Sequence, residues 1–184
     1  MTELALRIGL TPEHSCSYLP GESERLMVLL EDKFRNPAGY ENLLVAGFRR
    51  SGNDLYRPHC QHCEACRSLR IPVAQFTPSR SQKRIRQLNR DVHMVLSTQD
   101  KPEYYDLFAR YINERHFDGS MFPATRNQYD NFLLCDWLQP YYLEFRLDQH
   151  LIALAITDPL PHSLSAMYTF FAPEHAERSL GTHA

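Results

Sequence analysis

The sequence lacks several features that would assign its function at once. None of its apolar runs approaches the roughly 18–20 residues that a membrane-spanning helix needs, and residues 1–14 have neither the basic start nor the apolar stretch of a signal peptide. The sequence also contains no GxSxG turn, no HExxH helix and no GxxxxGK[ST] loop. These absences argue against serine-hydrolase, zinc-protease and P-loop nucleotide chemistry. We therefore expect a cytoplasmic protein with no membrane contact and no nucleotide cofactor.

Cysteine is scarce, and most of it is clustered. Only five cysteines occur in 184 residues, and Cys60, Cys63 and Cys66 repeat at three-residue spacing. An odd number with this clustering fits a reducing compartment better than a disulfide framework. One tight loop can present three soft sulfur ligands in this way, which indicates a metal site.

A closed tetrahedral metal site needs a fourth ligand. Cys16 is the natural candidate, with His59 and His62 as substitutes. Cys135 lies in an apolar helical stretch, where a buried small side chain is the simpler interpretation. The spacing fits either zinc or an iron–sulfur cluster.

The cysteine loop leads into a concentrated basic segment. Residues 67–90 contain seven Lys or Arg and no Asp or Glu, out of 20 Lys and Arg in the whole chain. Thr77-Pro78 offers a helix start, and on the helix that follows Arg80, Lys83, Arg84 and Arg90 share one side. An ordinary solvated helix face usually mixes charges of both signs, so this face favours binding of a polyanion.

The two halves of the chain differ in charge. Residues 1–90 carry 14 Lys/Arg and 9 Asp/Glu, net +5, whereas residues 91–184 carry 6 and 13, net −7. The split predicts two regions that face different partners. We place a cysteine-rich and basic region at 1–95 and a second domain at 96–184, in a protein of the α+β class.

Hydrophobic periodicity predicts most elements of the second domain. Earlier in the chain, residues 1–15 are expected to be an extended arm, 36–48 to contain a short helix, and 68–76 to be a strand. The further elements that we expect are a strand at 92–97, helices at 101–116 and 125–134, and strands at 141–146, 151–157 and 163–171.

The sequence offers little for nucleophilic catalysis. Glu114 and His116 lie near a predicted helix end, where surface residues are the simpler interpretation. Tyr168 is the one weak catalytic candidate, in a strand that is more typical of core. After Arg178-Ser179-Leu180-Gly181, which has the pattern of a loop opening a helix, only three residues follow. Since three meandering strands would leave an open edge, we expect the C-terminal part of this domain to be incomplete.

Three stretches together resemble a known family. They are CSYLPGE, LVAGFRRSGNDLYRPHCQHCEACRSLRIPVAQFTPSRSQKRIRQLNRD and LIALAITDPLPHSLSAMYTFFAPEHAERSLGTHA. The chain is similar to the arginyltransferase-like aminoacyl-tRNA–protein transferases, within which it resembles the bacterial enzymes of the N-degron pathway. The resemblance implies transfer of leucine from leucyl-tRNA to proteins that begin with Asp or Glu. It also implies a metal- or cluster-binding N-terminal region followed by an acyltransferase domain of the acetyltransferase-like (GNAT) fold.

The family's motifs fall on particular residues here. The resemblance implies that Cys16 belongs to the same site as the Cys60-Cys63-Cys66 loop. It also implies that the family's basic segment is Ser79–Arg84 and that its SLG loop is Ser179-Leu180-Gly181. We expect the tRNA- or acceptor-binding residues to be Arg80, Lys83, Arg84, Arg90, Arg178, Ser179 and Gly181. Arg80, Arg84 and Arg178 are candidates for reading the Asp or Glu carboxylate, because a guanidinium binds a carboxylate through two hydrogen bonds.

Three alternatives remain open at this point. Arginyl-tRNA is a second donor within the same class. A non-catalytic, metal-stabilised RNA-binding module fits the basic face and the cysteine loop, but it has no need of the acidic, aromatic second half. An acetyl-CoA N-acetyltransferase fits least, because it would want a glycine-rich pyrophosphate loop and ERSLGTHA contains one glycine.

Overall fold

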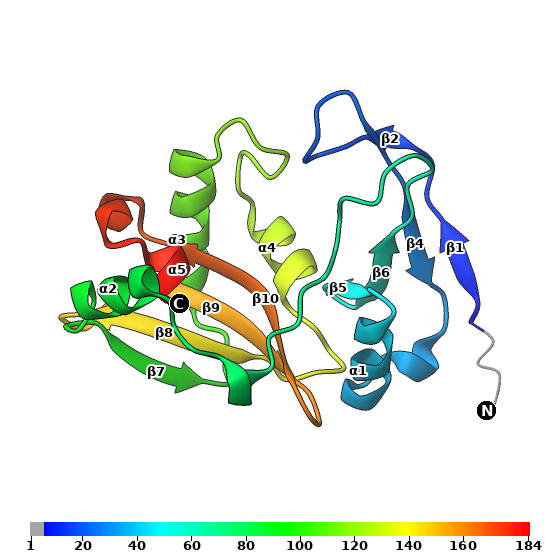
Figure 1. Ribbon diagram of the computed structural model, residues 1–184. Helices are drawn as coiled ribbons and strands as arrows, with labels where there is room; N and C mark the ends of the chain where they lie inside the picture. The colour runs from blue at the N-terminus through cyan, green and yellow to red at the C-terminus, as the bar shows by residue number, and fades with distance from the viewer. Residues whose placement is uncertain (1–5) are drawn as a thin grey trace. The chain divides into compact units, whose positions relative to one another are not determined.

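The computed structural model describes residues 6–184, and the chain divides into two compact units (Figure 1). Unit 1 contains the described residues up to Arg70, together with Cys135–Leu138 and Leu160–Ser163. Unit 2 contains Ile71–Leu134, Gln139–Pro159 and Leu164–Ala184. The first five residues of the expected N-terminal arm lie outside the described residues.

The division between the units falls after Arg70, whereas the sequence placed it after residue 95. The basic helix α2 (Arg80–Leu88) and strand β7 (His93–Ser97) belong to unit 2. Strand β7 pairs with a strand of unit 2 from end to end, and Asn89, just after α2, bonds a backbone carbonyl of the same unit. Charge composition therefore identified the basic segment, but it did not predict that this segment packs in unit 2.

Unit 1 is built on a four-stranded antiparallel sheet of order β1-β4-β6-β5, with a separate two-stranded ribbon β2-β3. Its buried core contains Met27, Leu29, Tyr40, Leu43, Phe48, Leu55 and Leu138. The elements are β1 (Ile8–Leu10), β2 (His14–Ser15), β3 (Ser23–Glu24), β4 (Leu26–Leu29), the 3-10 helix η1 (Asp32–Phe34), α1 (Pro37–Val45), β5 (Arg49–Ser51) and β6 (Asp54–Pro58).

Local sequence explains where helix α1 begins and ends. The Asn36 side chain accepts a hydrogen bond from the Gly39 amide at 2.9 Å, and Pro37 occupies the first helical position. The helix stops before Gly47, whose φ of 82° lies in the left-handed region that glycine tolerates. The expected short helix at 36–48 is confirmed.

Unit 2 is built on a four-stranded antiparallel sheet of order β10-β9-β8-β7. Besides α2 and β7, it contains the 3-10 helix η2 (Val73–Gln75), α3 (Pro102–Arg110), the π-helix η3 (Tyr111–Arg115), α4 (Arg126–Leu133), β8 (Tyr141–Leu147), β9 (His150–Pro159), β10 (Leu164–Phe171), the 3-10 helix η4 (Pro173–Arg178) and α5 (Leu180–His183). Periodicity thus predicted strands β7 to β10 and helices α3 and α4, whereas the pairing of β7 with β8 was not predicted.

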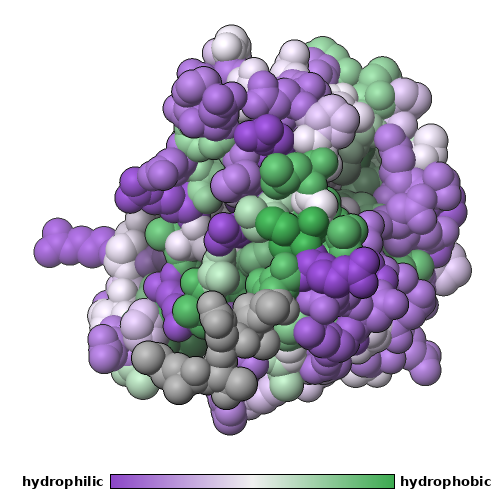
Figure 2. Space-filling model, turned by 90° about the vertical axis from the view of Figure 1, so that its right-hand side faces the viewer, coloured by the Kyte–Doolittle hydropathy of each residue, from purple (hydrophilic) through white to green (hydrophobic). Residues whose placement is uncertain are grey.

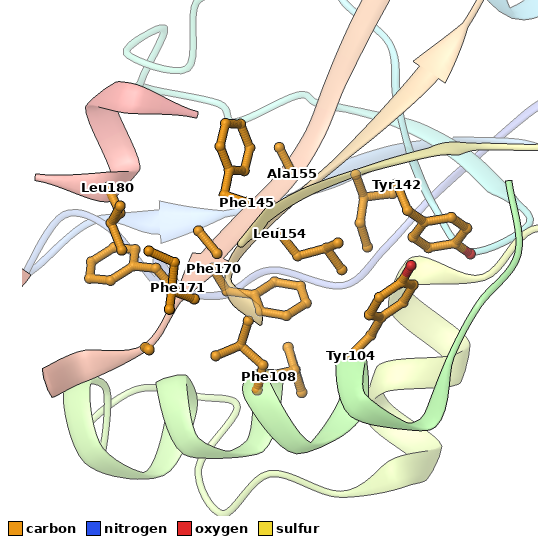
Figure 3. Close-up of a cluster of buried hydrophobic side chains, with 14 of the residues drawn as sticks. Tyr104, Phe108, Tyr142, Phe145, Leu154, Ala155, Phe170, Phe171 and Leu180 are labelled. Atoms are coloured by element: carbon orange, nitrogen blue, oxygen red, sulfur yellow. The ribbon is translucent and has the colours of Figure 1, made fainter. Parts of the chain in front are cut away.

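Helices cover both faces of this sheet. Neighbouring residues of a strand point to opposite faces. Glu144 of β8 contacts Tyr104 of α3, whereas the ring of Phe145, the next residue, lies 5.6 Å from that of His183 in α5. Helix α3 and helix α5 therefore lie on opposite faces. Figure 3 shows the core between the sheet and α3, with the ring of Phe108 directed at the strands.

Residues 68–76 do not form the expected strand. This segment is exposed along its whole length, with Leu69 at 91% and Val73 at 84%, and its only regular element is the turn of η2. Alternating apolar residues need a paired strand or a packed face, and Pro72 removes a donor that pairing would use. Among the described residues no strand pairs with this segment, so the alternation had no structural consequence.

The edge of the unit 1 sheet exposes apolar side chains. Ile8, Leu10 and Leu30 are 41%, 51% and 55% exposed. Figure 2, which looks onto the side of the molecule that carries β1, shows apolar surface surrounded by polar residues. Within residues 6–184, no helix combines the length and hydropathy that a membrane span requires.

Candidate nucleic-acid interface

Helix α2 presents the basic surface that the sequence predicted. Its cap is Ser79 rather than Thr77, because the Ser79 hydroxyl accepts from the Gln82 amide while the Gln82 side chain accepts from the Ser79 amide. Five cations on or just after this helix are exposed, and none of them pairs with a carboxylate among residues 6–184. They are Arg80, Lys83, Arg84, Arg86 and Arg90. Cations without internal partners are free to bind phosphate groups.

The loop at 178–181 has a constrained backbone. Ser179 adopts φ 54° and ψ 43°, a left-handed conformation that few residues other than glycine adopt. Leu180, the next residue, is fully buried in the unit 2 core. At Gly181 a side chain would meet the ring of Phe171 at 3.3 Å, so glycine allows the backbone to approach that ring.

The structure joins the basic helix to this loop. Asn89 is 2% exposed, and its amide nitrogen donates to the Ile85 carbonyl and to the Arg178 carbonyl, both at 2.9 Å. The Arg178 guanidinium binds Asp91 through two hydrogen bonds of 2.9 and 3.0 Å. Residues almost ninety positions apart in the chain are thereby fixed beside each other, and Figure 1 shows α2 and α5 as neighbours.

The charges of the loop follow from these contacts. Hydrogen bonding to Arg178 lowers the pKa of Asp91, and the same bond raises the pKa of Arg178. Burial lowers the pKa of His183, and the nearby Arg86 lowers it further. His183 is therefore neutral at pH 7, and the positive charge of this surface comes from the arginines and the lysine.

The structure brings together most, but not all, of the residues expected at the site. Arg178, Ser179 and Gly181 lie beside α2, although Arg178 already uses its guanidinium on Asp91. Tyr168 lies elsewhere: its ring packs against Phe132 and Phe108 of the α3–α4 layer. Sequence reasoning missed Asn89, since a lone asparagine after a basic helix carries no signal of its distant partner.

A buried carboxylate on the other sheet face was also missed. Glu144 is 1% exposed and accepts hydrogen bonds from Lys101, Tyr104 and Arg146. Burial raises the pKa of Glu144, but the hydrogen bonds outweigh burial, so its pKa lies below the usual value. Burial and the bond to Glu144 raise the pKa of Tyr104. This cluster joins α3 to β8, and its central carboxylate is buried and fully paired, which fits a structural role.

The four cysteines expected at the metal site line one cavity of unit 1. This cavity of about 280 Å³ has Cys16, Cys60, Cys63 and Cys66 in its wall. All four are free thiols, and the Cys16 sulfur accepts hydrogen bonds from the backbone amides of Tyr18 and Leu19, both at 3.4 Å.

The donor set suits a soft metal, but the sulfurs surround the cavity without converging. Among residues 6–184, no group of three or more His, Cys, Asp or Glu side chains is close enough to hold a metal ion. Four sulfur ligands are the set that zinc or an iron–sulfur cluster prefers.

Comparison with known proteins places both units in one family. Residues 14–84 match the family described as "Arginine-tRNA-protein transferase, N terminus". Residues 103–184 match the family described as "Arginine-tRNA-protein transferase, C terminus". The two matches include the cysteine cavity, most of α2 and the 178–181 loop.

Individual relatives carry one common name, aspartate/glutamate leucyltransferase. A relative from Aeromonas hydrophila is 65% identical over 182 residues, which cover 99% of this chain and 76% of the relative. A second from Pseudoalteromonas atlantica is 53% identical over 97% of this chain and 77% of its own length. A third from Pseudomonas fluorescens is 50% identical over 100% of this chain and 79% of its own. The chain thus belongs to the arginyltransferase-like aminoacyl-tRNA–protein transferases, in the group of the aspartate/glutamate leucyltransferases.

Proposed function

We propose that this protein transfers leucine from leucyl-tRNA to the N-terminal amine of proteins that begin with Asp or Glu, which marks them for degradation through the N-degron pathway. The observation that carries the proposal is the 65% identity to an aspartate/glutamate leucyltransferase over nearly the whole chain. Charged tRNA is a cytoplasmic substrate, so we assign the reaction to the cytoplasm.

The surface formed by α2 and the 178–181 loop is our candidate for the tRNA acceptor end. Its five exposed cations have no internal carboxylate partner among the described residues. Phosphate contacts of this kind give salt-dependent affinity with little sequence preference. That property suits a surface that contacts the tRNA backbone rather than its bases.

The proposed reaction needs little chemical help from the protein. The amine nitrogen attacks the leucyl carbonyl carbon, the new amide bond forms, the ester bond to the terminal ribose breaks, and the amine proton passes to the ribose oxygen. An N-terminal amine has a pKa of about 8, so a useful fraction is unprotonated at neutral pH. Positioning the amine and the ester at attack distance supplies much of the rate. This agrees with the absence of GxSxG and HExxH motifs from the sequence.

We also propose that unit 2 has an acetyltransferase-like fold. Support comes from the order of its elements, in which a strand, two helices, three antiparallel strands and a further helix follow one another. Helices on both faces of the sheet agree with this assignment.

For acceptor recognition we propose Arg80 and Arg84. Both guanidinium groups are exposed on α2, whereas that of Arg178 is occupied by Asp91. Single Arg80→Ala and Arg84→Ala variants should lose preference for Asp- and Glu-initiated peptides over Ala-initiated ones. If both keep the parental preference, another group reads the carboxylate.

The cysteine cavity is our candidate for a structural zinc ion or an iron–sulfur cluster. Cys16, Cys60, Cys63 and Cys66 would be its ligands, and the bound group would cross-link the 60–66 loop to the start of the chain. Metal content by elemental analysis tests this directly. A Cys→Ser change at each of the four should lower bound metal, whereas Cys135→Ser, at the fifth cysteine, should not. Equal metal in all five variants would exclude the assignment.

A transfer assay read by mass spectrometry tests the main proposal. The protein is mixed with a fully charged tRNA pool and with peptides that begin with Asp, Glu, Arg or Ala. We expect leucine on the Asp and Glu peptides alone. Arginine on those peptides would keep the family and change the donor. No transfer by a folded, metal-loaded sample that still binds tRNA would favour a non-catalytic RNA-binding module.

A further inference from the structure

Strand β7 is an edge strand with uncovered apolar side chains. It ends the order β10-β9-β8-β7, and Figure 1 shows it as the outermost strand of its sheet. Met94, Val95 and Leu96 are 64%, 44% and 55% exposed. On β8, the next strand, Tyr142 and Phe145 are only 3% and 5% exposed. Both faces of the sheet are therefore covered up to β8 and open at β7.

The usual protections of an edge strand are missing from β7. Edge strands commonly carry lysine, proline or a bulge, which prevent a further strand from pairing. The segment from His93 to Ser97 contains no lysine and no proline, and its register with β8 is unbroken. The opposite edge, β10, has a register shift between Ala166 and Tyr168, which bends that strand. Strand β7 is thus the edge of this sheet that can accept another strand.

The sequence of β7 is complementary to itself in the antiparallel direction. If Val95 lies opposite Val95 of a second copy, Met94 of each strand lies opposite Leu96 of the other. Directly opposed residues share a face of the sheet, so each face gains apolar cross-strand pairs. His93 and Ser97, both polar, then oppose each other at the two ends.

Both ends of β7 carry charges of both signs. On the N-terminal side Arg178 binds Asp91 and also interacts with Glu177 and Asp148, while Arg90 is exposed. On the C-terminal side Asp100 and Asp130 share the guanidinium of Arg126. The antiparallel direction therefore follows the pairing of the sheet itself, in which β7, β8, β9 and β10 are all antiparallel to their neighbours.

We propose that β7 is a self-association surface on which a second copy of this chain docks by antiparallel β7–β7 pairing centred on Val95. The pairing joins two four-stranded sheets into one continuous sheet of eight strands. Each outward backbone group of β7 then finds a partner, and the six apolar side chains of the two strands leave water together.

Sedimentation equilibrium across protein concentration tests the pairing. The parent should move from the monomer mass of 21.5 kDa toward twice that value as concentration rises. Val95→Lys and Val95→Glu each replace an apolar cross-strand pair by two like charges, so each should weaken association several-fold. An equimolar mixture of the two variants should restore the dimer, since lysine then opposes glutamate.

Val45→Lys is the matched control, because Val45 is 70% exposed at the end of α1 and lies outside the proposed surface. It should associate like the parent, and the circular dichroism spectra of all variants should match. A parent that stays monomeric at every concentration overturns the proposal and leaves the edge to a different partner. Association that is the same in both Val95 variants, or a mixture no stronger than either variant alone, also overturns it.

Discussion

Removal of positive charge from α2 should weaken tRNA binding in a way that salt reveals. The perturbation is the triple variant Arg80→Gln/Lys83→Gln/Arg84→Gln, in which glutamine keeps helix propensity while removing charge. If each of the five exposed cations contacts one phosphate when no acceptor peptide is bound, log K should fall with log salt at a slope of about −3.5 to −4.5. Two contacts remain in the triple variant, which reduces the slope to about −1.4 to −1.8.

These slopes predict a large difference in a single titration. Between 50 and 200 mM salt the parent should lose roughly 130- to 510-fold in affinity, and the triple variant only about 7- to 12-fold. Fluorescence anisotropy with labelled leucyl-acceptor tRNA at several salt concentrations measures both slopes. Circular dichroism checks that α2 is still folded.

The control separates local contacts from net charge. Lys33→Gln/Arg35→Gln/Arg126→Gln also removes three cations, but each of them already pairs with a carboxylate. This variant should keep a slope close to that of the parent. The reasoning is refuted if the α2 variant keeps the parental slope, or if both variants lose the same amount.

Three further predictions concern stability. Glu144→Gln should lower the free energy of unfolding by about 1.5–3 kcal/mol, because hydrogen bonds to a charged group are lost. The folded-state pKa of Glu144 is lowered, so the carboxylate stabilises the fold above its ordinary pKa of 4.5 and this stabilisation is lost on acidification. Urea unfolding at pH 7 and pH 4 should therefore show a smaller pH dependence in the variant. Asn89→Ala should lower the free energy of unfolding by about 2 kcal/mol, because the Arg178 carbonyl loses its hydrogen-bond donor. Hydrogen exchange at 179–183 should then accelerate, which distinguishes loss of this contact from a change confined to α2. The folded-state pKa of His183 lies below 6.5, so the folded protein binds a proton there less readily than the unfolded chain, and stability should fall as the pH drops below about 6.5. His183→Phe should remove this pH dependence from thermal melts between pH 5 and 8. An unchanged pH dependence would contradict the assignment.

The sequence predicted an element correctly where the neighbouring structure covers the side that its hydrophobic residues share. Helix α3 has Tyr104, Leu107 and Phe108 buried, as its periodicity indicated, because the sheet covers that side. The strand expected at 68–76 shows the same kind of pattern, but it fails because nothing in the described chain pairs with it. Alternation of apolar and polar residues predicts a strand only where a neighbouring strand can pair with it. Whether such a strand is present depends on the whole fold and not on the local sequence.

The candidate site shows the same limit. The basic face of α2 was predictable because its charges are neighbours in the sequence. The bond from Asn89 to the Arg178 carbonyl was not, since it joins residues 89 positions apart and neither is unusual locally. The four cysteines were predicted to act together, and they do line one cavity, but the spacing gave no information on how far apart the sulfurs lie.

The way in which unit 1 is assembled has a consequence for cleavage of the chain. The exposed segment at 68–76 contains Arg70, an accessible site for trypsin. A cut there would not free an intact unit 1, because Leu138 belongs to its core and the Trp137 indole donates to the Asn53 carbonyl at 3.1 Å. The two fragments should stay together in native buffer and separate only in denaturant. Separately expressed fragments should therefore complement each other, with unit 1 completed only when the second fragment supplies its two short segments.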